Sequence, residues 1–280
     1  MSVRSQLTSL ATKVLPATVL PRIKALYLLV SPSILKPPME SWDAACRMAK
    51  GYQADEILKR VSDATEKVVE SNGKLFERDS VLFEAPITPF PLLAFLLHCA
   101  SKNDNRLVVI DFGGSLGSTY RQCAPFLGHL SLFKWSVVEQ RHFVDVGRQK
   151  FSTDTLSFFE TIESAAAVAQ PSVIIFSGVL QYLEDPYSII ARAKATRPMA
   201  ILIDRNSVSA KDQDTFSVQV VPDEIFPASF PFRVFGQNSL ESALQPEFRV
   251  VAQAGSVDPD AYAGQIRVQF LFKAFERVSR

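Results

Sequence analysis

The chain has 280 residues, of which 47% are hydrophobic and 21% charged, a composition typical of an ordinary globular fold. Its 30 Lys and Arg residues nearly balance its 29 Asp and Glu residues, so no overall field attracts nucleic acid. The separate cysteines Cys46, Cys99 and Cys123 form neither a disulfide framework nor a zinc motif, which predicts reduced thiols and no metal site. No apolar run approaches the roughly 18 residues of a membrane span, and prolines interrupt the candidate signal peptide. We therefore expect a cytoplasmic protein.

The first predicted unit, residues 1–40, is a basic N-terminal arm. Five basic residues and no acid precede Glu40, and five prolines interrupt any helix. The one-sided charge and the scattered apolar side chains leave two interpretations. One is a simple docking segment, and the other is peripheral contact with the anionic inner face of a membrane.

Residues 41–104 predict a helical cap. Apolar residues recur at spacings of four, three and four between Ile57 and Val68, and Gly73 follows as a stop signal. A second helix is predicted over Thr88–Lys102, because prolines stand in its first turn and a row of Leu and Phe residues follows.

Residues 105–280 alternate between strands and helices. Helix-length stretches separate the first strands, which predicts a parallel sheet covered on both faces. The last two strands have no crossover helix between them, so we expect an antiparallel pair at the sheet's edge. The fold class is thus predicted as α/β, a Rossmann-like doubly wound sheet, mostly parallel with an antiparallel last strand, plus the N-terminal helical cap. The predicted strands are Leu107–Ile110, Trp135–Val138, Leu156–Phe159, Val173–Phe176, Ala200–Ile203, Phe248–Ala252 and Ile266–Phe272.

The turn after the first of these strands is the expected ligand site. In such sheets ligands bind at the carboxyl ends of the strands, and glycines let the backbone approach them closely. An acid about 20 residues further on accepts hydrogen bonds from ribose hydroxyls. Glu139 stands 22 positions after Gly117 and meets this requirement. The candidate cofactor-binding residues of the turn are Asp111, Gly113, Gly114, Ser115 and Gly117.

The details of the turn favour S-adenosylmethionine over a dinucleotide. A dinucleotide fingerprint starting at Gly113 meets Ser115 and Ser118 where it needs glycines. An acid such as Asp111 suits a positively charged sulfonium and repels a diphosphate. Two alternatives stay open, a nicotinamide-dependent (NAD(P)) Rossmann oxidoreductase and a non-catalytic scaffold that has lost its cofactor. The turn by itself also fits a glycine turn that merely closes a βα unit.

The segment VIIFSGVLQYLEDP (Val173–Pro186) supplies the third part of the predicted site. Small residues leave room for the methionine end of the cofactor, so Ser177, Gly178 and Val179 are candidates to present backbone to it. Gln181 and Tyr182 would then face the substrate. The alternative is a strand-to-helix turn with the tyrosine packed against the sheet.

Six short blocks in one order resemble the class I S-adenosylmethionine-dependent methyltransferases. The closer resemblance is to a methyltransferase family associated with bacterial surface-polysaccharide biosynthesis, and it runs from about Trp42 to Val250. The resemblance implies a seven-stranded sheet with an antiparallel last strand, a cofactor at Asp111–Gly117 and Glu139, and methyl transfer to a small acceptor such as a sugar or glycolipid precursor. Ser115 departs from the middle glycine of the general class. The blocks are KGY (Lys50–Tyr52), FERDSVLF (Phe76–Phe83), DFGGSLG (Asp111–Gly117), SGVLQYLEDP (Ser177–Pro186), ILIDR (Ile201–Arg205) and FPASFPFRVF (Phe226–Phe235).

The remaining candidates surround the expected acceptor. Asp204 and Arg205 follow the fifth strand and are candidate catalytic residues with Gln181 and Tyr182, the alternative being a salt-bridged loop pair. A general base helps only a hydroxyl acceptor. Arg78 lies in a segment expected to fold over the cofactor as a lid beside Tyr52, or else to form an ion pair within the domain. Phe230 belongs to a predicted rigid aromatic loop that lines an acceptor pocket or joins the core.

Overall fold

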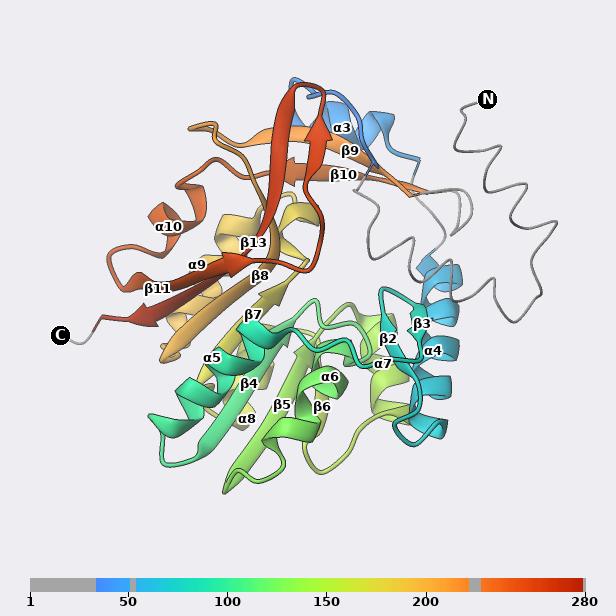
Figure 1. Cartoon of the computed structure of the whole chain (residues 1–280), viewed down its shortest axis with the longest axis vertical. Helices are drawn as coiled ribbons and strands as arrows, with labels where there is room; N and C mark the ends of the chain where they lie inside the picture. Colours follow the sequence, from blue (N-terminus) through green and yellow to red (C-terminus); the bar gives the residue numbers. More distant parts are fainter. Residues whose placement is uncertain (1–33, 51–53, 222–227, 279–280) are drawn as a thin grey trace.

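The computed structural model describes residues 34–50, 54–221 and 228–278 (Figure 1). An 11-stranded sheet forms its centre, and a separate two-stranded hairpin lies beside it. Most of the predicted N-terminal arm, and with it the proposed membrane contact, lies outside the described residues. Within the described part of the chain, no helix has the length and apolar character needed to cross a bilayer.

Seven strands of the sheet form the predicted Rossmann-like unit, which confirms the fold class. The long strand β13 (Ile266–Arg277) runs antiparallel to β8, and β11 (Phe248–Gly255) pairs antiparallel with β13. The antiparallel last strand and its pairing are therefore also confirmed. The parallel strands follow the spatial order β6 (Leu156–Phe159), β5 (Leu132–Val138), β4 (Arg106–Phe112), β7 (Val173–Ser177) and β8 (Ala200–Val208).

Helices cover both faces of this unit because its strands are apolar on both sides. Along β4, Leu107 and Val109 pack into one hydrophobic cluster, whereas Ile110 packs into the other. This alternation follows the two-residue period of a strand. The first cluster includes side chains of α5 (Phe90–Ser101), α6 (Ser118–Leu127) and α7 (Arg141–Lys150), and the second those of α8 (Ile162–Val168), α9 (Pro186–Ala195) and α10 (Ser239–Leu244).

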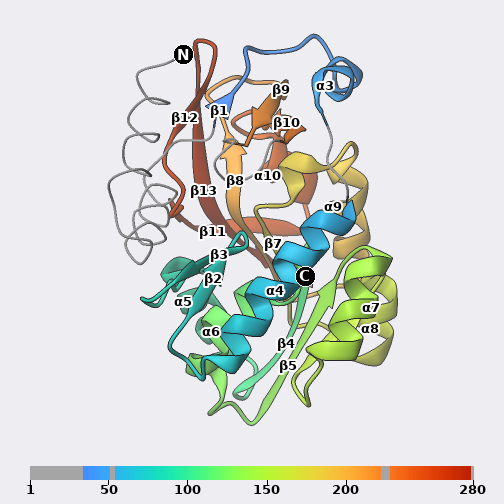
Figure 2. The ribbon, with the colours of Figure 1, turned by 90° about the vertical axis from the view of Figure 1, so that its right-hand side faces the viewer.

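The predicted antiparallel pair lies at an edge of the sheet, with β11 outermost, but the sheet also continues from the first residues of β13. The first residues of β13 pair with β12 (Ala261–Ala263), and β1 (Ile34–Leu35) joins β12 to β9 (Thr215–Val220). Figure 2 shows β1, β9 and β12 above the parallel strands β4 and β5. The extension was not predicted because its strands are short and pair with segments far away in the sequence.

The expected aromatic loop is in part a strand. Residues 229–234 form β10 (Ser229–Val234), which pairs with β9 along its whole length. Pro231 is compatible with a strand here because β10 is the last strand of the sheet, where a missing backbone N–H need not break a ladder. Phe232 is buried in the core and Phe230 is half-buried. Phe226 lies outside the described residues.

Residues 41–104 contain more than helices. After α3 (Trp42–Met48) and α4 (Ala54–Glu70), the strands β2 (Phe76–Arg78) and β3 (Val81–Phe83) form a hairpin. Its turn residues Asp79 and Ser80 have φ of 52° and 65°, the positive values of a two-residue hairpin turn. In Figure 2, α4 lies between this hairpin and α7. The following helix, α5, packs on the sheet itself.

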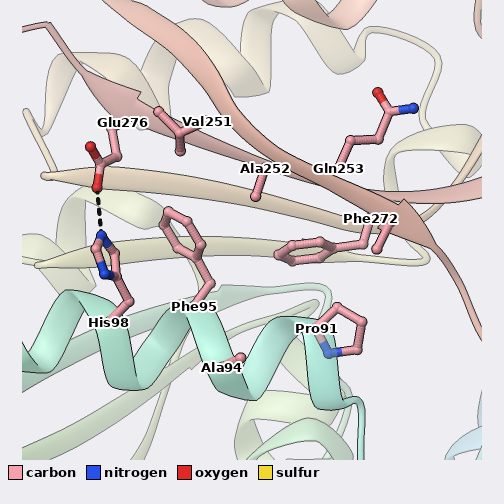
Figure 3. Close-up of a pocket in the computed structure, with 10 residues that line it drawn as sticks. Pro91, Ala94, Phe95, His98, Val251, Ala252, Gln253, Phe272 and Glu276 are labelled. Carbon is pink, nitrogen blue, oxygen red and sulfur yellow. Dashed lines mark hydrogen bonds and ion pairs between the residues drawn. The ribbon is translucent and has the colours of Figure 1, made fainter.

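A surface groove between α5 and the strands β11 and β13 is shown in Figure 3. It has a volume of about 460 Å³ and is lined mainly by apolar side chains. At one end His98 Nε2 lies 3.0 Å from Glu276 Oε1. His98 lies in the last turn of α5, and the larger cavity at the carboxyl edge of the sheet is lined by Pro89, at the other end of this helix.

Candidate functional site

The carboxyl ends of the parallel strands meet at a cavity of about 670 Å³. Strand register places Phe112 beside Val138 and Phe176, and Ser177 beside Asp204, so the segments that follow these strands share one edge. Of the predicted site residues, Asp111 and Gly117 do not line the cavity, and Tyr52 lies outside the described residues. Those that line it are Arg78, Gly113, Gly114, Ser115, Glu139, Ser177, Gly178, Val179, Gln181, Tyr182, Asp204, Arg205 and Phe230.

The glycine turn has no room for side chains at two positions. A Cβ atom on Gly113 would lie 2.4 Å from Val179 Cγ2, and one on Gly114 would lie 2.6 Å from the Asp111 carboxylate. Gly113 also has a φ of 73°, which favours glycine. Ser115 adopts a φ of 54°, so the residue at the middle position keeps a conformation typical of glycine at a cost of about 1 kcal/mol. All three residues line the cavity.

Asp111 lies against the glycine turn and does not line the cavity, so its contact with a cofactor stays a prediction. Its side chain is only 1% exposed and lies on the face of β4 that Val109 also uses, according to the two-residue strand period. Trp135 Nε1 donates a hydrogen bond of 3.2 Å to Asp111 Oδ2. Oδ1 has no hydrogen-bond partner within the described part of the chain. Burial raises the pKa of this carboxyl to about 7.

This raised pKa predicts a stability that falls with increasing pH. An unfolded Asp has a pKa of about 3.9, so between about pH 4 and pH 7 the folded chain binds more protons than the unfolded chain. The Asp111→Asn variant keeps an acceptor for Trp135 and carries no charge. Its stability gain over the parent chain should grow by about 2–3 kcal/mol between pH 5 and pH 8. Urea unfolding at the two pH values measures this difference, and a difference independent of pH would contradict a buried titrating carboxyl.

Glu139 follows β5 and places its carboxylate at the cavity next to the glycine turn. The backbone N–H of Gln140 donates a hydrogen bond of 2.8 Å to Glu139 Oε2. Burial raises the pKa of Glu139, whereas backbone hydrogen bonds from Gln140 and Ser115 lower it. These bonds hold the side chain where it can accept further hydrogen bonds from a ligand in the cavity.

The ends of β7 and β8 are joined by polar contacts. Ser177 Oγ donates a hydrogen bond of 3.1 Å to Asp204 Oδ2, and the backbone N–H of Gly178 donates one of 2.9 Å to the Asp204 carbonyl. Burial raises the pKa of Asp204, while Arg205 and Ser177 lower it. Gln181 donates to the Arg205 carbonyl at 3.1 Å. The carboxylate of Asp204 therefore sits at the cavity wall in a fixed orientation.

Tyr182 and Phe230 form an aromatic wall of the cavity. Their rings meet edge to face with centroids 6.3 Å apart, and the Tyr182 hydroxyl donates a hydrogen bond of 2.6 Å to Gln219 Oε1. Tyr182 is 38% exposed and lines the cavity, although its ring and hydroxyl also contact the sheet strands β10 and β9. Gln219 comes from β9, a strand that sequence reasoning missed.

Arg205 joins the hairpin to the sheet extension. It has a φ of 54° and bonds Asp79 Oδ2 at 2.6 Å and Asp258 Oδ2 at 2.7 Å. Arg78 lies 3.8 Å from a carboxylate oxygen of each of these aspartates. The ion pair that was the alternative to a lid is thus present between Arg78 and Asp79. The described contacts of Arg205 are with Asp79 and Asp258, which are distant in the sequence, and not with its neighbour Asp204. We define Arg78, Asp79, Arg205 and Asp258 as the arginine cluster.

Two acidic residues at the cavity were missed by sequence reasoning. Glu77 is buried in the hairpin, accepts hydrogen bonds from Ser118 Oγ and from the Ser80 N–H, and has a pKa raised by burial. An acid inside the apolar block FERDSVLF was a usable signal for Glu77. Asp258 gave none, because it lies far from the hairpin in the sequence. Within the described part of the chain, no His, Cys, Asp and Glu cluster could hold a metal ion.

The topology and the cavity together define a Rossmann-like α/β protein with a cavity at the carboxyl edge of its sheet. No protein-family model and no curated protein matches the chain. Among solved structures, the N-terminal domain of EvdMO1, solved with S-adenosylhomocysteine (SAH) and D-fucose, is similar at a TM-score of 0.48 and 12% identity, covering 82% of this chain and 98% of that one.

Two further structures are similar at comparable levels. The Burkholderia thailandensis 1,6-didemethyltoxoflavin-N1-methyltransferase has a TM-score of 0.46 and 15% identity, and covers 89% of this chain and 97% of its own. The glycopeptide N-methyltransferase MtfA, complexed with sinefungin, has a TM-score of 0.41 and 12% identity, with coverage of 65% and 92%. Because these TM-scores and identities are low, the fold class rests on this chain's own sheet order and not on the similar structures.

Proposed function

We propose that the chain is an S-adenosylmethionine-dependent methyltransferase that acts on a hydroxyl of a small acceptor. One observation carries the proposal. The turn Gly113–Ser115, the carboxylate of Glu139 and the segment Ser177–Val179 line one cavity at the carboxyl edge of the sheet. This is where doubly wound sheets bind nucleotide-like ligands.

The residues present fit an adenosyl cofactor. Glu139 can accept hydrogen bonds from both ribose hydroxyls, and Gly113 and Gly114 allow the backbone to approach the ligand. Ser177 and Gly178 leave space for the amino-acid end. A dinucleotide fits less well, because Ser115 and Ser118 stand at the fingerprint's glycine positions.

The opposite side of the cavity suits an acceptor with hydroxyl groups on a ring. Tyr182 and Phe230 offer aromatic surface, and Asp204 offers a carboxylate for the acceptor's proton. When bound, the cofactor supplies an activated methyl group. This chain's residues orient the acceptor oxygen and exclude water, which contributes several kcal/mol. A sugar or glycolipid precursor of a surface polysaccharide is the acceptor that we propose on the basis of the sequence resemblance.

Isothermal titration calorimetry with SAH, and in parallel with NADH and NADPH, tests this proposal. We expect saturable binding of SAH and none of either dinucleotide. No binding of SAH at millimolar concentration would reject the methyltransferase, and binding of a dinucleotide would favour an oxidoreductase. Methyl transfer from S-adenosylmethionine to candidate sugars would then separate an enzyme from a non-catalytic scaffold.

A further inference from the structure

Arg78 is the buried cation at this cavity whose hydrogen-bonding capacity is least used. Its side chain is only 8% exposed, and it lines the cavity. Its Nη1 atom has no hydrogen-bond partner within the described part of the chain. A buried guanidinium with an unsatisfied donor is costly unless a partner arrives.

The neighbouring carboxylates do not fill this role. Asp79 and Asp258 each bond Arg205 at 2.6–2.7 Å. Both stand 3.8 Å from Arg78, which is beyond hydrogen-bonding distance. The nearby acid Glu77 is also engaged, because Ser80 and Ser118 donate hydrogen bonds to it. The arginine cluster is thus balanced in charge, yet it leaves one buried guanidinium donor of a cavity-lining residue without a partner within the described part of the chain.

We propose that Arg78 binds a carboxylate of the ligand, namely that of the amino-acid end of the adenosyl cofactor. This inference rests on the proposed function and extends it to the residue that recognises the cofactor's negative charge. The hairpin contacts α6, which follows the glycine turn, through Glu77 and Ser118, and it contacts Arg205, which lies next to Gly178, through Asp79. Arg78 Nη2 lies 3.8 Å from Asp258, which bonds Arg205 beside Gly178, so the guanidinium stands on the side of the cavity where we place the amino-acid end.

Two probes that differ only at the amino-acid end test the assignment. SAH carries the carboxylate, and 5′-methylthioadenosine lacks the whole amino-acid portion. In Arg78→Gln the affinity for SAH should fall about 10- to 100-fold, the value of a hydrogen bond to a charged group, while the affinity for 5′-methylthioadenosine stays unchanged. Arg78→Lys, which keeps the charge without the planar fork, should lose less affinity for SAH.

Controls separate this effect from damage to the fold. Arg47→Gln removes an exposed arginine outside the cavity and should change neither affinity. Circular dichroism checks folding, and if Arg78→Gln does not fold, the Arg78→Lys variant carries the comparison. An equal loss of both affinities, or no loss of either, would overturn the assignment of Arg78 and leave the methyltransferase proposal standing. Failure of the unmodified chain to bind either probe would instead reject the proposed function.

Discussion

Replacing Gly113 with alanine is expected to destabilise the folded chain by about 2–4 kcal/mol, because the new Cβ clashes and the backbone conformation is unfavourable. The Cβ would lie 2.4 Å from Val179 Cγ2 and 2.8 Å from Val179 Cβ, and φ is 73°. Val179 lines the cavity, so any movement that relieves the clash also alters the site. Urea unfolding measures the stability, and titration with SAH measures the second effect.

A matched glycine isolates the steric part of this effect. Gly73 also has a positive φ, 85°, but a Cβ atom there would meet nothing within 4 Å. Gly73→Ala should therefore cost only about 1 kcal/mol and leave SAH affinity unchanged. Equal losses of stability in the two variants would mean that the close contact between Gly113 and Val179 does not exist in solution.

Replacing Glu139 with alanine is expected to weaken SAH binding by about 100-fold or more, since two hydrogen bonds to a charged group are lost. The carboxylate lies at the cavity and is oriented by the backbone of Gln140. Calorimetry gives the affinity, and the 2′-deoxy analogue of SAH, which keeps one ribose hydroxyl, should bind the parent chain less tightly than SAH and lose less affinity than SAH does in Glu139→Ala.

The control for this prediction is a carboxylate on the next helix. Asp145 belongs to α7, is 63% exposed and does not line the cavity. Asp145→Ala should retain the parent affinity. If Glu139→Ala binds SAH as tightly as Asp145→Ala does, the placement of the ribose at the end of β5 is contradicted.

The parallel sheet and its glycine turn could be predicted from the sequence because both depend on local patterns. Strands buried on both faces appear as short apolar, β-branched runs such as Val173–Ser177, and helix-length stretches between them predict crossovers. The turn at Gly113 and the acid Glu139 follow from their distance to these runs. Their common location is a consequence of parallel strands ending at one edge.

The sheet extension and the arginine cluster could not be predicted in this way. Strand β1 has two residues, and its partners in β9 lie more than 180 positions later. Arg205 meets Asp79 and Asp258 only because the hairpin and the sheet extension meet in the folded chain. The orientation of Asp111 was predictable, because Val109 and Asp111 share one face of a strand by the two-residue period.

The most direct test of the central proposal is a crystal structure of the chain with SAH. We expect both ribose hydroxyls to lie within hydrogen-bonding distance of Glu139 and the glycine turn to contact the ligand. The amino-acid carboxylate should lie against Arg78. A ligand seated elsewhere, for example in the groove between α5 and β11, or a cavity closed to it by neighbouring side chains, would contradict the proposed cofactor site.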